Sequence, residues 1–223
     1  MSAGIVVLCA VLGAVAGAVA IVPALRTIPD PWETPRQLQW SVVAVNAVLW
    51  ALVANSFTLG WWLPAYFVAF SILLAVSVVD IRLYRIPDRF VFPGLAITIV
   101  LVVIASFIEP GNSTTGSDLR YAGVGLLSYF AILFVAHVVY PRGMGFGDVK
   151  LSLLMGLILG WPAGSSANAV YLVLMALIFG CVIGIVFGLA WRVIQRQGGA
   201  FPFGPALAAA TIFVVLSRHT WIV

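Results

Sequence analysis

Long apolar runs, separated by short polar loops, constrain this chain more than any other feature of its sequence. Eight such segments span roughly residues 4–25, 40–59, 62–79, 90–108, 121–140, 149–163, 168–191 and 203–217. About 18 apolar residues in succession suffice for a helix to cross a hydrocarbon core of roughly 30 Å, whereas a membrane β-barrel would show short alternating segments. The sequence therefore predicts an all-α, polytopic bundle of about eight transmembrane helices, forming a single membrane domain over residues 1–223. The sixth segment is short, so we expect it to be tilted, half-buried or partly re-entrant.

The composition excludes several other classes of protein. Only 8% of the residues are charged, far below the roughly 25% typical of soluble domains, which excludes a water-soluble enzyme and a disordered chain. Cys9 and Cys181 stand alone in apolar runs and suggest neither a zinc site nor a disulfide framework. The basic residues are scattered through short loops, so no stripe could follow a nucleic-acid backbone. The sequence contains no HExxH or GxSxG motif, and we expect no metal or other cofactor.

Basic residues alternate sharply between the two sets of loops. One set carries nine of the eleven Lys and Arg residues, and the opposite set carries only Arg120 and Arg218. The richer set consists of Arg26, Arg36, Arg82, Arg85, Arg89, Arg142, Lys150, Arg192 and Arg196. Because cytoplasmic loops are enriched in Lys and Arg, this set is predicted to face the cytoplasm, which places both termini outside.

Asp80 and Asp148 are the two acidic residues that the predicted topology brings together. Asp80 ends the third apolar segment, and Asp148 begins the sixth, directly after the glycine-rich residues 143–147. An ionisable group at membrane depth is costly and points to a function. Two close carboxyl groups tend to share one proton; such a pair can position a water molecule, remove its proton and protonate a leaving amine. The pattern therefore indicates peptide hydrolysis without a metal or a covalent intermediate.

Less specific interpretations of these residues stay open. Asp148 could simply be the N-cap of the sixth helix, and Asp88, which follows Pro87, is predicted to be the N-cap of the fourth. A transporter or channel could use Asp80 and Asp148 as proton or cation sites, and a non-enzymatic scaffold of a secretion machine is a third possibility. His137 has no second histidine or carboxylate nearby in the sequence, so we expect it to pack inside the bundle with one hydrogen bond.

Three short segments resemble the type IV prepilin peptidases, a family of GxGD intramembrane aspartic proteases. Residues 80–89, DIRLYRIPDR, are similar to the first aspartate motif of the family, and residues 143–151, GMGFGDVKL, are similar to its GxGD motif. Phe203-Gly204-Pro205 resembles the FGP stretch before the last span. The order, spacing and eight-span layout agree with the family over roughly residues 70–217. Pro205-Ala206-Leu207 also spells the PAL motif of presenilin-like proteases, but the FGP interpretation accounts for the same residues.

The resemblance implies an intramembrane aspartic endopeptidase. Family members remove a short basic leader from prepilins or pseudopilins at the cytoplasmic face of the cell membrane. The implied partners are these precursors and membrane lipid. The resemblance assigns Asp80 and Asp148 as the catalytic pair. The residues that the resemblance assigns to shaping the site are Gly145, Gly147, Lys150, Pro87, Gly204 and Pro205.

The chain departs from the full-length family pattern in one region. Many members carry a cytoplasmic domain after the first span, often with paired CxxC motifs, and also N-methylate the new terminus. Here residues 26–39 occupy that position and contain no cysteine. The resemblance therefore implies the short, peptidase-only form, in which N-methyltransferase activity is not expected. The sequence does not indicate the prepilin served, the leader-binding residues, the oligomeric state, or which aspartate holds the shared proton.

Overall fold

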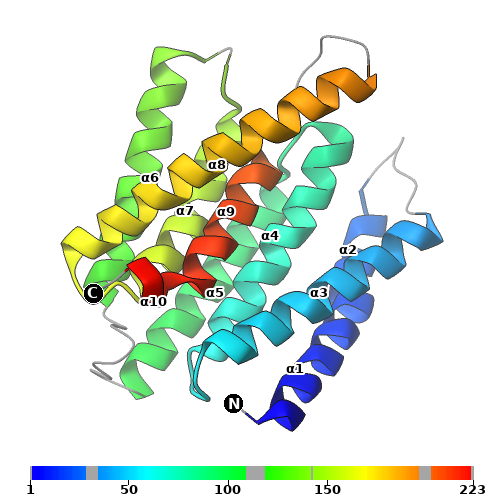
Figure 1. Cartoon of the computed structure of the whole chain (residues 1–223), viewed down its shortest axis with the longest axis vertical. Helices are drawn as coiled ribbons and strands as arrows, with labels where there is room; N and C mark the ends of the chain where they lie inside the picture. The colour runs from blue at the N-terminus through cyan, green and yellow to red at the C-terminus, as the bar shows by residue number, and fades with distance from the viewer. Residues whose placement is uncertain (1, 29–34, 109–118, 142, 196–201, 222–223) are drawn as a thin grey trace.

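The computed structural model describes residues 2–28, 35–108, 119–141, 143–195 and 202–221, and all eight predicted segments form helices (Figure 1). The helices are α1 (Ala3–Ala16), continued by a π-helical turn (Gly17–Ile21) and α2 (Val22–Arg26), then α3 (Arg36–Ser56), α4 (Leu63–Leu83), α5 (Asp88–Ile108), α6 (Leu119–Val139), α7 (Phe146–Gly160), α8 (Ser166–Gln195), α9 (Gly204–Leu216) and the short α10 (Arg218–Trp221). The described residues contain no strand, which confirms the all-α prediction.

Six of the described helical segments are long and apolar enough to cross a membrane: the α1–α2 unit, α3, α4, α5, α6 and the first 25 residues of α8. The chain is therefore an integral membrane protein. The remaining two predicted spans form the shorter helices α7, of 15 residues, and α9, of 13 residues. Eight helices were thus predicted correctly, although only six of the described ones have the length of an independent span.

Proline chemistry explains the π-helical turn in the first membrane helix. Pro23 lies in the first turn of α2, where it has no N–H to donate to the preceding turn and its ring needs extra room. A single wider turn, Gly17–Ile21, provides that room without ending the helix. The predicted span over residues 4–25 is therefore one continuous crossing.

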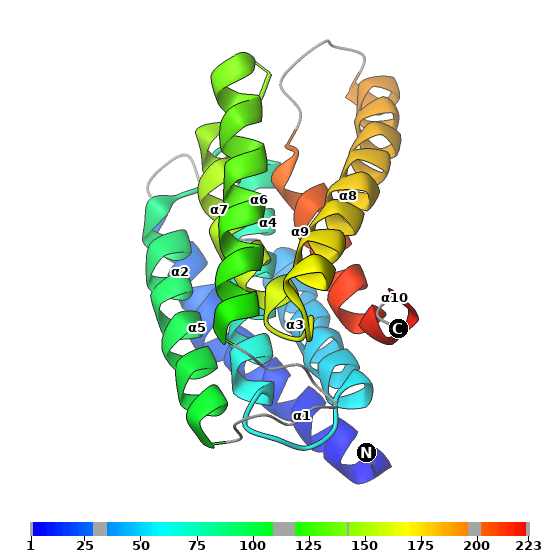
Figure 2. The same cartoon turned by 90° about the vertical axis from the view of Figure 1, so that its left-hand side faces the viewer.

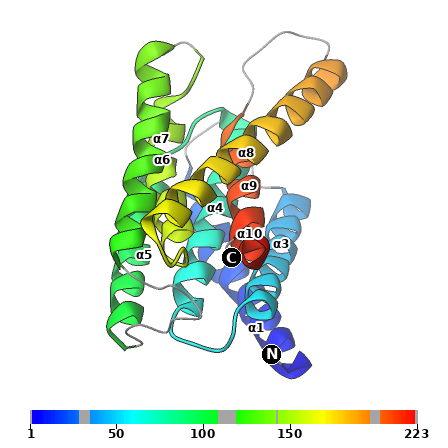
Figure 3. The same cartoon turned by 60° about the vertical axis from the view of Figure 1, so that its left-hand side comes forward.

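Helix α7 occupies the interior of the bundle. It contacts α4, α5, α6, α8 and α9, and eleven of its fifteen residues are buried. Figure 2 shows α7 running alongside the longer α6, and Figure 3 shows α8 crossing obliquely over α9. Since other helices surround α7, it does not need the length of a lipid-facing span. The sixth segment was expected to be tilted, half-buried or partly re-entrant, and the structure shows a helix that is more than half buried.

Glycine residues permit an unusually close contact between α6 and α7. A Cβ atom added at Gly156 would meet the carbonyl oxygen of Gly125 and would lie 2.8 Å from the Cα atom of Leu126. A Cβ added at Gly125 would likewise lie 2.7 Å from the Cα atom of Gly160. Backbone atoms cannot rotate out of the way as a side chain can, so the two helices would have to separate. This contact therefore determines how closely the C-terminal half of α7 packs against α6.

We expect Gly156→Ala to destabilise the folded protein by roughly 1–3 kcal/mol, because overpacking of this size forces the backbone to shift. Gly123→Ala on α6 is the matched control. A Cβ atom added at Gly123 faces open space, because no atom of another helix lies within 4 Å of it. Thermal unfolding of the two variants in detergent compares them directly. Equal midpoints for both variants would show that the α6–α7 contact can relax at little cost.

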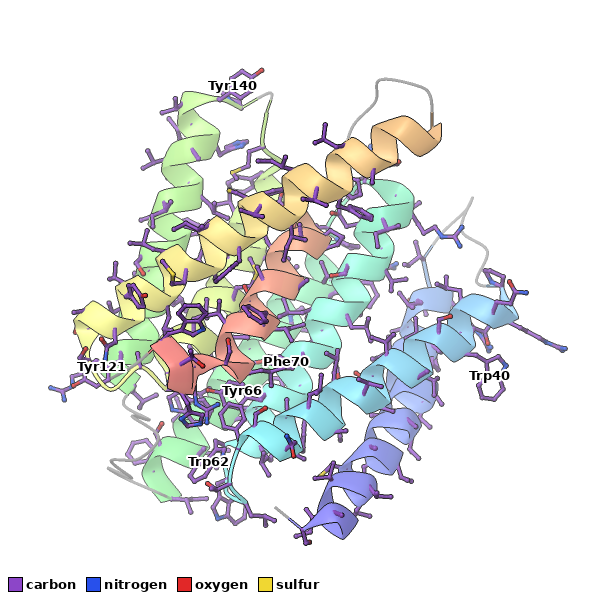
Figure 4. All side chains as sticks on the ribbon, viewed as in Figure 1. Trp40, Trp62, Tyr66, Phe70, Tyr121 and Tyr140 are labelled. Atoms are coloured by element: carbon purple, nitrogen blue, oxygen red, sulfur yellow. The ribbon has the colours of Figure 1, made fainter. Side chains whose placement is uncertain are left out.

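Aromatic side chains close the end of the bundle where α10 lies. The ring of Tyr66 stacks on Trp161, with 5.5 Å between centroids, and contacts Phe57 at 4.3 Å. The buried Arg218 guanidinium lies 3.6 Å from the centre of the Phe57 ring and donates hydrogen bonds to the carbonyl oxygens of Val215 and Ser56. Figure 4 shows Tyr66 among the helices of this cluster, whereas Trp40 projects away from the bundle. The cluster anchors the C-terminal helices to the α3–α4 hairpin.

Candidate active site

Asp80 lies in the last turn of α4 and is 6% exposed. The helix continues to Leu83, and Tyr84 then adopts a left-handed backbone conformation with φ 52°, donating its N–H to the Asp80 carbonyl at 2.9 Å. A bulky residue rarely adopts this conformation, and here it turns the chain sharply at the end of the helix. Asp80 is therefore held on a regular helix, three residues before its end. The third apolar segment was predicted to end at Asp80, and the helix continues three residues beyond it.

Asp148 is the third residue of α7 and is 7% exposed. The N-cap of α7 is Gly145, in an extended conformation, and the Asp148 N–H donates to its carbonyl at 3.1 Å. The interpretation of Asp148 as the N-cap is therefore wrong. Its buried Oδ1 atom has no hydrogen-bond partner among the described residues. A carboxyl group at this position faces the positive end of the helix dipole and is free to engage a bound molecule.

The two aspartates meet at the first residue of α9. The backbone N–H of Gly204 donates a hydrogen bond to Oδ2 of Asp80 at 3.1 Å. A Cβ added to Gly204 would lie 2.8 Å from Oδ2 of Asp80 and 3.4 Å from Oδ1 of Asp148. The two carboxyl groups therefore flank the same glycine, although they lie 68 positions apart in the sequence. The C-terminal end of α4 and the N-terminal ends of α7 and α9 come together at the upper end of the bundle in Figure 1.

Ile86 fills the space between the segments that carry the aspartates. A Cβ at Gly147 would lie 2.8 Å from the Ile86 Cβ, and a Cβ at Gly204 would lie 3.2 Å from the Ile86 Cδ1. The absence of a side chain at Gly147 and Gly204 thus lets the α4–α5 connection pack into the site. Gly145 differs, because its added Cβ would make only an ordinary 3.5 Å contact with Asp148 Oδ2. The packing role of Ile86 was not predicted from the sequence. The one signal for it was the position of Ile86 directly before Pro87 in the first motif.

The two motif prolines begin helices. The carbonyl oxygen of Pro87 accepts hydrogen bonds from the N–H groups of Phe90 and Val91, and Pro205 lies in the first turn of α9. Proline suits a helix start because its missing N–H would have no intrahelical partner there.

The predicted N-cap role of Asp88 is not what the structure shows. Asp88 is the first residue of α5, and its carboxylate accepts two hydrogen bonds from Lys150 Nζ, at 2.7 and 2.8 Å.

His137 supports the chain just before α7. Its Nδ1 lies 2.9 Å from the carbonyl oxygen of Met144, so the ring is protonated at Nδ1 and donates to that carbonyl. The ring also lies 5.3 Å from that of Phe146, centroid to centroid. The predicted single hydrogen bond is present, but the ring is only partly buried rather than packed inside the bundle. The contact further shows that His137 holds the GxGD segment, which the sequence did not suggest.

Two buried hydroxyl groups lie in the interior of the bundle. Tyr129 on α6 and Thr211 on α9 are fully buried, and neither hydroxyl oxygen has a hydrogen-bond partner among the described residues. Sequence reasoning missed both residues, because a lone Tyr or Thr in an apolar helix gives no distinctive signal.

No basic side chain neutralises the aspartates within the described residues. Arg82 and Arg85 are exposed, and neither forms an ion pair with Asp80 there. In the same described part of the chain, no group of three or more His, Cys, Asp or Glu residues could hold a metal ion. The chemical groups that converge here are thus two carboxyls and a backbone N–H, an arrangement suited to proton transfer to and from a bound water.

The fold and the site together define an integral membrane protein with a pair of buried aspartates at one end of its helical bundle. The sequence model described as the type IV leader peptidase family matches residues 67–189, which include both aspartates and more than half of the chain. The chain therefore belongs to the type IV leader peptidase family.

Curated relatives are similar to this chain over most of its length. It is 30% identical to a prepilin leader peptidase/N-methyltransferase of Bacillus subtilis (strain 168) over 177 residues, covering 77% of this chain and 63% of the relative. A protein of the same name from Aeromonas salmonicida (strain A449) is 27% identical over 171 residues, covering 76% of this chain and 54% of the relative. The chain thus spans only part of the length of these relatives. No solved structure matches it significantly.

Proposed function

We propose that this protein is an intramembrane aspartic endopeptidase that removes the leader peptide from prepilin-like precursors. The observation that carries the proposal is the convergence of the Asp80 and Asp148 carboxyl groups on Gly204. Membership of the type IV leader peptidase family and the names of its relatives support the same activity. Asp80 and Asp148 are the proposed catalytic residues.

The proposed reaction is a direct attack of water on the scissile peptide bond. One carboxylate accepts a proton from the water as its oxygen bonds to the carbonyl carbon, and the protonated carboxyl donates its proton to the amide nitrogen as the C–N bond breaks. The products are a new carboxylic acid on the leader and a new amine on the mature subunit, and these ionise in water to a carboxylate and an ammonium group. The pair has gained one proton and lost one, so it returns to its single-proton state. The Gly204 N–H keeps Asp80 oriented, and the low polarity around the pair strengthens each proton-transfer interaction.

The proposed substrate is a precursor with a short basic leader followed by an apolar helix. Asp80 and Asp148 lie at the end of the bundle that also carries Arg82, Arg85 and Lys150. By the positive-inside rule we place this end at the cytoplasmic face, where such a leader would meet the site as its apolar helix enters the membrane. Methylation of the new terminus is not part of the proposal, because residues 26–39 contain no cysteine.

Topology reporters test the placement of the site. A fusion after Arg85, between α4 and α5, should report the cytoplasm, and a fusion after Gly164, between α7 and α8, should report the opposite side. These two connections lie at opposite ends of the bundle (Figure 1). The inverse pattern would place the carboxyl pair outside, where a cytoplasmic leader could not reach it.

Cleavage itself is tested by co-expressing the protein with a prepilin-like precursor from the same genome. The expected result is a smaller product on a gel, with an N-terminus at the junction between the basic leader and the apolar helix. The precursor expressed without the protein is the control. Uncleaved precursor in both strains, across all such precursors of the genome, would contradict the proposed function.

A further inference from the structure

The side-chain ammonium of Lys150 is enclosed by one carboxylate and two aromatic rings. Nζ donates to both carboxylate oxygens of Asp88, at 2.7 and 2.8 Å. It also lies 5.7 Å from the centre of the Phe92 ring and 5.2 Å from that of Phe146, within the range of cation–π attraction. Phe92 is four residues after Asp88 on α5, and Phe146 is four residues before Lys150 on α7. Each helix thus supplies one charge and one ring from neighbouring turns.

This contact joins the two segments that carry the proposed catalytic residues. Lys150 follows Asp148 by two residues on α7, and Asp88 follows Asp80 by eight residues, just after the α4–α5 connection. Ile86, in the connection between α4 and α5, packs against the backbone at Gly147 and approaches Gly204. A shift of Asp88 away from α7 would draw Ile86 with it and loosen the packing on which both carboxyl groups depend.

The exposure of the pair argues against a role in overall stability. The Lys150 side chain is 23% exposed and that of Asp88 is 55% exposed. Ion pairs with this much access to solvent contribute little to folding free energy, because water and salt screen them. The packing of α7 among five other helices is the far larger contribution. The pair is therefore better suited to setting a local position than to holding the fold together.

We propose that the Asp88–Lys150 ion pair positions the α4–α5 connection against α7 and thereby sets the relative placement of Asp80 and Asp148. Asp88 and Lys150 are positioning residues, since neither touches the reacting atoms. This role rests on the proposed peptidase function, because it concerns the geometry of that same site. A displacement of about 1 Å between catalytic groups can reduce a rate about a hundredfold, so a modest loosening is enough to matter.

Loss of the pair should lower kcat at least about tenfold while KM and the unfolding temperature change little. Lys150→Met keeps most of the side-chain length and removes the charge, and Asp88→Asn removes the opposite charge. Arg85→Met is the matched control, because it removes an exposed cation from the same connection without breaking an ion pair among the described residues. The double variant Asp88→Lys with Lys150→Glu restores an ion pair with the charges exchanged, and it should recover part of the lost kcat. If the loss came only from a local packing defect, exchanging the charges would not recover it.

Amide hydrogen exchange tests the same proposal without any substrate. Lys150→Met should speed exchange at residues 84–91 and at the start of α7, with α6 unchanged, and Arg85→Met should not. Wild-type exchange at these residues should also rise as salt increases from about 0.1 to about 1 M, because the Debye length falls from about 10 to about 3 Å.

The outcomes separate the two proposals. A wild-type protein that cleaves, together with unaltered kcat and exchange in Lys150→Met, would overturn the positioning role alone. A wild-type protein that cleaves none of the precursors would overturn the proposed function, and the exchange measurement would still decide whether the pair holds the connection. A lower unfolding temperature in Lys150→Met, with no recovery in the exchanged pair, would reduce the contact to a structural one.

Discussion

Asp80→Asn and Asp148→Asn should each abolish cleavage of a prepilin-like precursor while leaving the protein folded and inserted. Asn has nearly the same volume as Asp but cannot exchange a proton, and each buried position tolerates a neutral side chain. Loss of acid or base catalysis typically costs about 10²–10⁴-fold in rate, and water would then have no activating partner. Product formation by each purified variant, measured with time, gives the rate directly.

The comparison needs a control for folding. Both variants should unfold at or above the wild-type temperature, because replacing a buried ionisable group by a neutral one removes a desolvation cost. Gly123→Ala, on the open face of α6, accounts for effects of mutagenesis and purification and should cleave normally. Near-wild-type cleavage by either aspartate variant would rule out the aspartic mechanism.

Gly204→Ala is expected to reduce cleavage about a hundredfold with little loss of stability. The added Cβ would lie 2.8 Å from Asp80 Oδ2 and 3.4 Å from Asp148 Oδ1, so at least one carboxyl group must move. Alanine is well tolerated at the start of a helix, which confines the damage to the site. The measurement is kcat at saturating precursor, set beside the unfolding temperature of the same sample.

A second glycine variant separates crowding at the site from crowding elsewhere. Gly156→Ala also introduces a close contact, but with the backbone of α6, so its main effect should be on the unfolding temperature. Gly204→Ala should show the reverse pattern, with kcat reduced and stability kept. If Gly204→Ala cleaved at the wild-type rate, the carboxyl groups would have room to adjust and the tight geometry around Gly204 would not matter for catalysis.

Much of the fold could be predicted because each crossing has a strong apolar signal. The exceptions have physical causes. Helix α7 is only 15 residues long, and its burial depends on five neighbouring helices, which no local pattern encodes. The extension of α4 past Asp80 was not predicted, because polar residues such as Arg82 are typical of a loop. In the structure they continue the helix, which ends where Tyr84 adopts a left-handed backbone conformation.

The site was partly predictable for similar reasons. The charge pattern and the number of crossings bring Asp80 and Asp148 to one end, and the structure places them on either side of Gly204. The N–H contact from Gly204 depends on a helix start 124 residues after Asp80, so spacing alone could not supply it. The role expected for Asp88 differed because capping is a local property, whereas its partner Lys150 lies 62 residues further along the chain.

The most direct measurement is cleavage by the purified protein in liposomes. Wild-type protein and Asp148→Asn would be incubated separately with purified prepilin-like precursors of the same genome, and both fragments would be identified by mass spectrometry. We expect the wild type to cut one precursor once, at the junction of the basic leader and the apolar helix, and Asp148→Asn to leave it intact. Precursors that stay intact with the wild type, or the same fragments from Asp148→Asn, would contradict the assignment of this protein as an intramembrane aspartic peptidase.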